Sequence, residues 1–247
     1  MFFGDTMLMI QADLHTHTVA STHAYSTVSE NAAYAAEIGL KAVAVTDHGC
    51  GSPDSPHIWH FDNLSVLPRK IKGVYVLRGI EANIVDDDYG LDVGEKVLGK
   101  LEWVIASLHS QTFSPADKKK NTEMYLKLCE NKDIDVFGHP TTAKFPFDME
   151  KCVKKCKEYG KFVEINESSI IHGKSPVNIC VELLGLCKKY NLPVVVNTDS
   201  HFCELIGHTD TVTKMLEDLD FPKDLVFNSD WDRVREHIIN KHGTIGL

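Results

Sequence analysis

Short apolar, β-branched runs alternate with helical patterns along nearly the whole chain of 247 residues. Seven such runs can be recognised, among them MLMIQADLH, KAVAVTDH and PVVVNTDSH. Several are apolar almost without interruption, as strands that are buried on both faces tend to be. Strands that alternate with helices predict βα units and a parallel sheet. Seven units on one chain favour a closed or nearly closed barrel over an open doubly wound sheet, which would more often carry a glycine-rich loop after its first strand.

Residues that commonly cap helices delimit the helical segments. Ser29 is the expected N-cap of the first helix, and Gly160 and Asn191 stand where a left-handed residue often ends a helix. The run from Lys118 to Lys120 indicates a solvated surface beside a loop, and VDDDYG predicts a hairpin turn that extends the third strand. We expect helices over residues 29–39, 149–160, 177–191, 210–219 and 229–243.

Length, charge and cysteine content narrow the class of protein. No linker or change of composition divides the chain, so we expect a single α/β domain over residues 7–245. The net charge of -9 argues against long nucleic acids as partners. The seven cysteines form no C-x-x-C pair, and the N-terminus lacks a basic segment and a long apolar stretch. These features predict a cytoplasmic protein with reduced thiols and no membrane span, and they leave a homo-oligomer open.

The polar residues at the ends of the apolar runs are of the types that bind metal ions. In a parallel barrel the carboxyl ends of the strands share one face, where active sites are built. Side-chain alternation along the first strand also places Asp13 on the face of the histidines that follow it. The residues at successive strand ends are His15, His17, Asp47, His48, Glu81, His109, His139, Glu164, Asn166, Asp199 and His201.

So many imidazoles packed together without a cation would repel one another when protonated and lose hydration when neutral. The pattern therefore predicts a multinuclear metal site. Imidazoles with only a few carboxylates favour zinc, iron or manganese over calcium or magnesium, which prefer shells of oxygen ligands. The strand ends alone leave open whether two or more ions are bound.

The segments DLHTHT, TDHG, GIEAN, SLH, GHP and DSH occur in the order found in the polymerase and histidinol phosphatase (PHP) family, which the chain resembles over nearly its whole length. VASTHAYSTVSE and PHIWHF resemble most closely the YcdX-type phosphatases of that family. The resemblance implies a distorted, TIM-like (β/α) barrel of seven strands with a trinuclear centre, usually of zinc. Because STHAYS replaces the Cys-Pro-His-Gly-like segment typical of histidinol phosphatases, histidinol phosphate is a less favoured substrate.

The resemblance also implies how the ligands are shared among the ions, with Glu81 as a bridge between two of them. His23 lies in the loop after the first strand, so strand ends alone would not identify it. The implied arrangement is one ion held by His15, His17, Glu81 and Asp199, a second by Glu81, His109 and His139, and a third by His23, His48 and His201.

These residues lead to the hypothesis of a metal-dependent phosphatase that acts on a small phosphomonoester. Bound ions would neutralise phosphoryl oxygens and lower the pKa of a water that attacks phosphorus. Asp47 is a candidate for orienting a ligand or accepting a proton, and His57, Arg78 and Ser169 are candidates for substrate contact. The alternatives are a phosphodiesterase or exonuclease, a metal-dependent amidohydrolase and a non-catalytic metal-binding module.

Overall fold

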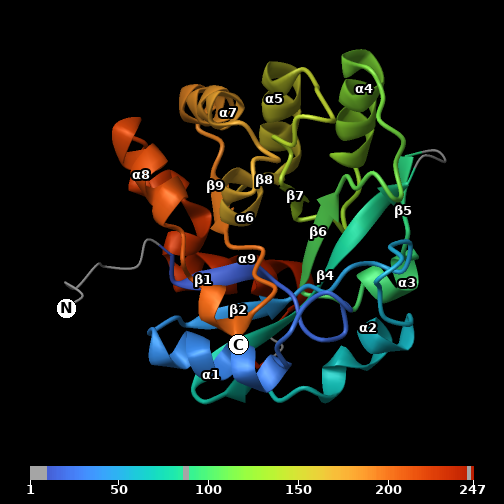
Figure 1. Ribbon diagram of the computed structural model, residues 1–247, viewed down its shortest axis with the longest axis vertical. Coiled ribbons are helices and arrows are strands. Elements are labelled where there is room, and N and C mark those ends of the chain that lie inside the picture. Colours follow the sequence, from blue (N-terminus) through green and yellow to red (C-terminus); the bar gives the residue numbers. More distant parts are fainter. Residues whose placement is uncertain (1–9, 86–88, 244–245) are drawn as a thin grey trace.

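The computed structural model describes residues 10–85, 89–243 and 246–247. Its central sheet contains parallel strands in the order β1-β2-β4-β6-β7-β8-β9, which is also their order along the chain (Figure 1). Each βα unit therefore lies beside the preceding one, and the expected seven-stranded parallel barrel is confirmed. The strands are β1 (Ala12–Thr16), β2 (Ala42–Val45), β4 (Val74–Val85), β6 (Trp103–Ser107), β7 (Val136–Gly138), β8 (Phe162–Asn166) and β9 (Val194–Asn197).

Two short strands extend β4 at its ends. β3 (Lys70–Ile71) and β5 (Gly90–Leu91) both pair antiparallel with it, and the pairing of β5 confirms the hairpin expected there. Residues 86–88 of the hairpin turn lie outside the described residues, as do the expected domain limits at residues 7 and 245. Within the described ranges, no helix is long and apolar enough to cross a membrane.

Backbone and side-chain hydrogen bonds join the first and last strands of the barrel. Thr16 and Ser200 form an isolated parallel bridge. Nearby, the Asn228 side chain accepts a hydrogen bond from Val196 N at 3.0 Å and donates to the carbonyl oxygens of Ala12 at 2.7 Å and Val196 at 2.6 Å. Because one side chain satisfies backbone groups of both β1 and β9, the barrel is nearly closed at this seam.

Helices surround the strands, with α1 below them and α4, α5 and α7 above them in the view of Figure 1. The expected helices match α1, α5, α7, α8 and α9, and Gly160 and Asn191 have the left-handed backbone expected at helix ends. The helices are α1 (Val28–Glu37), α2 (Trp59–Asn63), α3 (Glu95–Leu98), α4 (Lys118–Leu128), α5 (Met149–Tyr159), α6 (Glu167–Ile171), α7 (Val177–Tyr190), α8 (Asp210–Asp218) and α9 (Trp231–His242).

One expected helix start is wrong, and a segment expected as solvated surface also begins a helix. The N-cap of α1 is Thr27 and not Ser29, because Thr27 forms a capping box with Glu30. The Thr27 hydroxyl accepts from Glu30 N at 3.3 Å, and the Glu30 carboxylate accepts from Thr27 N at 2.7 Å. The run Lys118–Lys120 lies on the surface, as expected, and it also forms the first turn of α4, which Asp117 caps.

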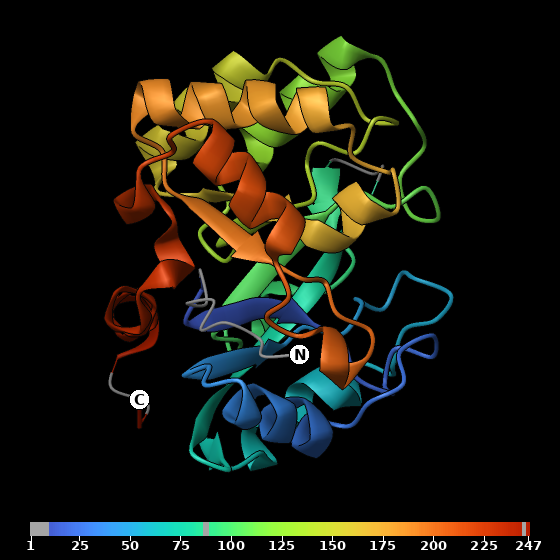
Figure 2. The same cartoon turned by 60° about the vertical axis from the view of Figure 1, so that its left-hand side comes forward.

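Apolar side chains fill the barrel interior and close its amino-terminal end. Trp103 is fully buried there, and Trp231 of α9 belongs to the same cluster. Asp135, which precedes β7, fixes α9 through His237 Nε2 at 2.9 Å and Lys241 Nζ at 2.6 Å. Figure 2 shows α9, in dark red, beside the tails of the strand arrows. The opposite face, where the strands end, is therefore left for the polar residues.

Candidate metal centre

Glu81 lies at the centre of a group of histidines at the carboxyl-terminal ends of the strands. Its Oε1 atom is 2.9 Å from His139 Nε2 and 3.4 Å from His109 Nε2. Its Oε2 atom is 2.8 Å from His48 Nδ1 and 3.4 Å from His15 Nε2. The two oxygens of this carboxylate therefore face two different sets of imidazoles.

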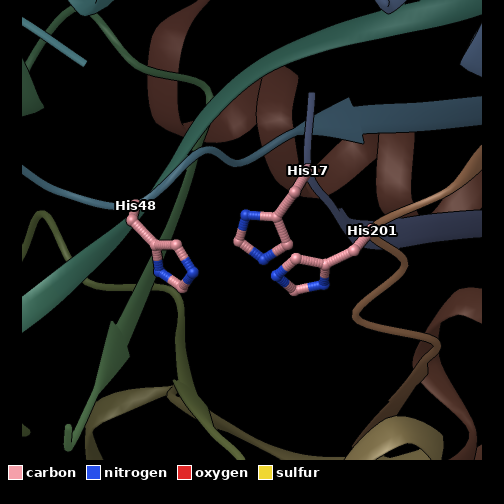
Figure 3. A group of neighbouring side chains, drawn as sticks. All are labelled: His17, His48 and His201. Carbon is pink, nitrogen blue, oxygen red and sulfur yellow. The ribbon is translucent and has the colours of Figure 1, made fainter. Parts of the chain in front are cut away.

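A second part of the group surrounds Asp199, whose Oδ1 atom is 3.0 Å from His17 Nε2. His17, His48 and His201 point their rings toward one another (Figure 3). The ring centroid of His17 lies 4.4 Å from that of His48 and 4.3 Å from that of His201. His23, from the loop after β1, has its ring centroid 4.3 Å from that of His201. The structure thus brings the loop histidine to the same place as the strand-end histidines.

Asp13 does not join this group, although alternation predicts that it shares a face with the histidines that follow it. The pairing of β1 with β2 changes register between Asp13 and Thr16, so strict alternation ends there. Asp13 instead accepts hydrogen bonds from Thr198 Oγ1 at 2.5 Å and Gly207 N at 3.1 Å. It anchors the segment that follows β9, and burial raises its pKa to about 6.

Several buried atoms of the group have no hydrogen-bond partner within the described part of the chain. Leaving a buried polar atom unpaired costs about 1–3 kcal/mol. A cation would give each of them a partner, and the imidazole-rich donor set fits zinc or a similar transition metal. The unpaired atoms are His15 Nε2, His17 Nδ1 and His201 Nε2, and the 2.8 Å contact between His48 Nδ1 and Glu81 Oε2 is not aligned as a hydrogen bond.

The ligand atoms form overlapping sets of three that are compact enough to share an ion. Each set places its candidate ligand atoms within 4.8 Å of one another. The sets are His15, His17 and Asp199; His17, His48 and His201; His48, Glu81 and His109; and His23, His48 and Asp54.

Hydrogen bonds outside the group determine which ring nitrogen faces it. Glu164 Oε1 lies 2.8 Å from His15 Nδ1, and Asn83 Oδ1 lies 2.7 Å from His109 Nδ1. His201 Nδ1 lies 3.0 Å from the backbone carbonyl oxygen two residues earlier. Because these oxygens accept, the network assigns the ring proton to Nδ1 in each case. Nε2 then keeps its lone pair, which is the form that binds metal.

Asn83 is itself held by a buried carboxylate. Its Nδ2 donates to Asp92 Oδ2 at 2.6 Å, and Gly51 N donates to the same oxygen at 2.6 Å. A Cβ atom at Gly49 would lie only 2.5 Å from Asp92 Oδ1. The glycine of the TDHG segment therefore allows Asp92 to approach and orient Asn83, which in turn orients His109.

Burial and neighbouring charges shift the pKa values of the group in different directions. Burial lowers the pKa values of the imidazoles, but the surrounding carboxylates raise those of His15, His48 and His139 above the usual value. Burial opposes the ionisation of Glu81, but His15 and His109 hold its pKa well below the usual value. Burial and the nearby His48 lower the pKa of His17 to about 4. At neutral pH the central carboxylate is therefore charged, and His17 is neutral and able to act as a ligand.

The backbone is unusual at two of these residues. His139 has a φ of 29° and Asp199 a φ of 55°, and both values are positive. Positive φ is uncommon for residues other than glycine, and such conformations are concentrated at functional sites.

Asp47 lies behind the group rather than facing it. Its buried carboxylate accepts from Thr18 N at 2.8 Å and Ser21 Oγ at 2.8 Å, and lies 3.1 Å from His60 Nε2. Asp47 therefore fixes the loop that carries His23 and ties it to α2.

The three residues predicted to contact substrate lie in different places. Ser169 lines a cavity of about 570 Å³, and several histidines of the group line the same cavity. Arg78 instead donates to the backbone carbonyl oxygens of Ser65 and Leu67 at 3.1 and 3.0 Å. It is not among the described residues that line the cavity. His57 is exposed to solvent and is also not among the described residues that line the cavity. Its ring contacts Trp59 edge to face.

Asp54 is a candidate ligand that the sequence analysis missed. Its Oδ2 atom lies 2.8 Å from His23 Nδ1 and 3.8 Å from His48 Nε2. Asp54 stands in the loop between β2 and α2, where no periodic pattern marks it. The available signal was its position between two segments that already carried candidate residues.

Residues 13–171 match the family model of the PHP domain. A probable phosphatase of Caldanaerobacter subterraneus subsp. tengcongensis is 41% identical over 245 residues, which cover 98% of this chain and 96% of that protein. A probable phosphatase of Clostridium novyi is 43% identical over 230 residues, covering 93% and 94% of the two chains.

The fold resembles that of histidinol phosphate phosphatase from Lactococcus lactis subsp. lactis, with a TM-score of 0.58 and 15% sequence identity. The match covers 86% of this chain and 94% of that one, whose structure was solved with zinc, L-histidinol and phosphate.

Proposed function

The chain belongs to the PHP family, and on this premise we propose that it is a metal-dependent phosphatase that hydrolyses a small phosphomonoester. The observation that carries the proposal is the position of Glu81, whose two oxygens face separate sets of histidines beside an open cavity. The relatives that match nearly the whole chain are named probable phosphatases, which supports the same reaction class.

We assign a trinuclear centre, with zinc as the first choice and manganese or iron as alternatives. Bound ions would supply a water of lowered pKa and neutralise the charge of the phosphoryl oxygens. Zinc in the histidinol phosphate phosphatase of Lactococcus lactis accords with this choice of metal. The proposed ligands are His15, His17, His23, His48, Glu81, His109, His139, Asp199 and His201.

The chain's own residues have three tasks in this proposal. Glu81 bridges the two sets of histidines, so that adjacent ions would share one carboxylate. Glu164 and Asn83 hold protons on the far nitrogens of their histidine partners and so keep the near nitrogens free. The cavity beside the group leaves room for a phosphomonoester of modest size. No protein nucleophile is required.

The test is hydrolysis of an aryl phosphate by protein stripped with a chelator and then restored with zinc or manganese. We expect activity to disappear and return, with elemental analysis giving the number of ions per chain. His109→Ala should remain folded and become inactive, because it removes a ligand beside Glu81. His237→Ala is the matched control, since it removes an imidazole at the opposite end of the barrel.

Other outcomes would redirect the assignment. Cleavage of a diester but not of a monoester would favour the phosphodiesterase class. Metal binding without hydrolysis of either would contradict the proposed function and favour an amidohydrolase or a metal-binding module.

A further inference from the structure

The cavity beside the histidine group extends toward the loops that follow β7 and α6, where Lys144 and Lys174 line it. Within the described chain, neither ammonium group has a carboxylate or hydrogen-bond partner. Lysines elsewhere on the protein are commonly paired with acidic side chains. Such lysines are Lys100, Lys151, Lys154, Lys155, Lys188, Lys189, Lys214 and Lys241.

Two acidic residues, Asp54 and Asp199, are among the described residues that line the cavity. Both face the histidine group, since Asp54 lies 2.8 Å from His23 and Asp199 lies 3.0 Å from His17. The other charged side chains that line this cavity are Lys144 and Lys174, so its part away from the proposed metal centre has an excess of positive charge in a chain whose net charge is -9. Such a local excess attracts anions. Lys174 also lines a neighbouring cavity, where Glu167 and Asp210 are the acidic residues besides Asp199.

Backbone hydrogen bonds hold the two lysine segments together. Ala143 N donates to the carbonyl oxygen of Lys174 at 3.0 Å, which places the two loops side by side. On the first loop, Thr142 N donates to the carbonyl oxygen of His139 at 3.1 Å. The lysines are thus connected through short, hydrogen-bonded turns to a residue of the proposed metal centre.

We propose that Lys144 and Lys174 form a subsite for a second anionic group, so that the preferred substrate is a phosphomonoester that also carries another phosphate or a carboxylate. This inference rests on the proposed function, because the scissile phosphate would lie at the histidine group. Lysine binds phosphate and carboxylate as a mobile point charge, so the shared chemistry is a terminal anion on a flexible spacer.

The test compares butyl phosphate, its analogue with a terminal carboxylate, and butanediol bisphosphate as substrates of the metal-restored enzyme. Shorter and longer homologues vary the spacing between the anions. We expect kcat/KM for at least one substrate with a second anion to exceed that for its simple alkyl phosphate by about tenfold or more, as charged hydrogen bonds allow. The carboxylate and bisphosphate series show which anion is preferred.

Lys144→Ala/Lys174→Ala should reduce that ratio by about tenfold. The control Lys41→Ala/Lys132→Ala removes the same charge from exposed positions before β2 and β7, at the other end of the barrel, and should leave the ratio unchanged. Equal kcat/KM values for all three kinds of substrate would overturn the proposed subsite, and so would a ratio that is unchanged in the Lys144→Ala/Lys174→Ala variant. In either case, hydrolysis of the alkyl phosphate would still support the phosphatase. Absence of turnover with every phosphate and metal would overturn both.

Discussion

Glu164→Gln changes one buried group that contacts the proposed metal centre only through hydrogen bonds. Glu164 Oε1 lies 2.8 Å from His15 Nδ1 and accepts from Asn197 Nδ2 at 2.8 Å. Its Oε2 atom accepts from His139 N at 2.7 Å and from Asn166 Nδ2 at 3.0 Å. All four neighbours thus supply a proton to a group that only accepts. A glutamine amide must replace one of the two accepting oxygens with a donor.

Either orientation of the new amide has a cost. If its nitrogen faces His15, Nδ1 must accept and the proton moves to Nε2, which then cannot bind metal. If its nitrogen faces His139, the donors His139 N and Asn166 Nδ2 lie opposite the amide NH₂, which is also a donor. Their lost hydrogen bonds would lower the free energy of unfolding by about 1–3 kcal/mol. Changes to such metal-orienting partners reduce metal affinity by about 10–100-fold. That range corresponds to about 1.4–2.8 kcal/mol.

The assay is zinc binding in competition with a chromophoric chelator, with unfolding measured in parallel. Glu167→Gln is the matched control, because this buried carboxylate accepts from Thr211 N at 3.0 Å and Val212 N at 2.9 Å instead of orienting a proposed ligand. We expect both variants to lose stability and only Glu164→Gln to lose zinc affinity. Unchanged zinc affinity in a folded Glu164→Gln protein would refute the tautomer argument.

Three further predictions concern other parts of the barrel. Gly49→Ala should lower kcat/KM of the metal-restored enzyme by about tenfold, because the new Cβ would meet Asp92 at 2.5 Å; kinetics like those of the wild type would contradict this. Burial opposes ionisation of Asp135, but its neighbours His237 and Lys241 hold its pKa below the usual value of 3.8. The charged carboxylate therefore stabilises the fold fully above pH 3.8, and this stabilisation is lost as the pH falls further. Asp135→Asn should therefore lower the free energy of unfolding by about 3–5 kcal/mol at neutral pH and by less in acid, and a difference independent of pH in denaturant titrations would disprove the linkage. Finally, a thiol reagent should label only the partly exposed Cys50 and Cys203 in the folded protein, and the buried thiols only after unfolding; fast labelling of more than two thiols would show the packing to be wrong.

The barrel could be predicted because its signal is repeated and local. Each βα unit shows its own change from an apolar run to a helical period, and the strands pair in chain order. The errors occur where a single contact overrides that pattern. Glu30 selects Thr27 as the cap of α1, and a register shift after Asp13 turns that carboxylate toward Thr198. The lysine-rich start of α4 has no apolar period that would reveal a helix.

The site likewise has a part that could be predicted from the sequence and a part that could not. The first depends on the order of the strands, and the second depends on individual hydrogen bonds between loops. The histidines at strand ends converge because the topology brings those ends together, so residue type and position predict their meeting. Asp54 meets His23 where Thr22 N donates to the Asp54 carbonyl oxygen at 3.0 Å, a hydrogen bond that joins the loops after β1 and β2.

The lysine pair arises by the same kind of contact, through the hydrogen bond from Ala143 N to the Lys174 carbonyl oxygen. Such a bond between two loops leaves no periodic signal in either segment, because any non-proline residue can supply its N–H and any residue its carbonyl. Sequence motifs therefore predict which residues meet at the proposed metal centre, whereas the residues that would distinguish one phosphate ester from another depend on how neighbouring loops pair. Substitutions that preserve every strand-end histidine but alter this loop pairing should therefore change substrate preference before they change the dependence of activity on metal.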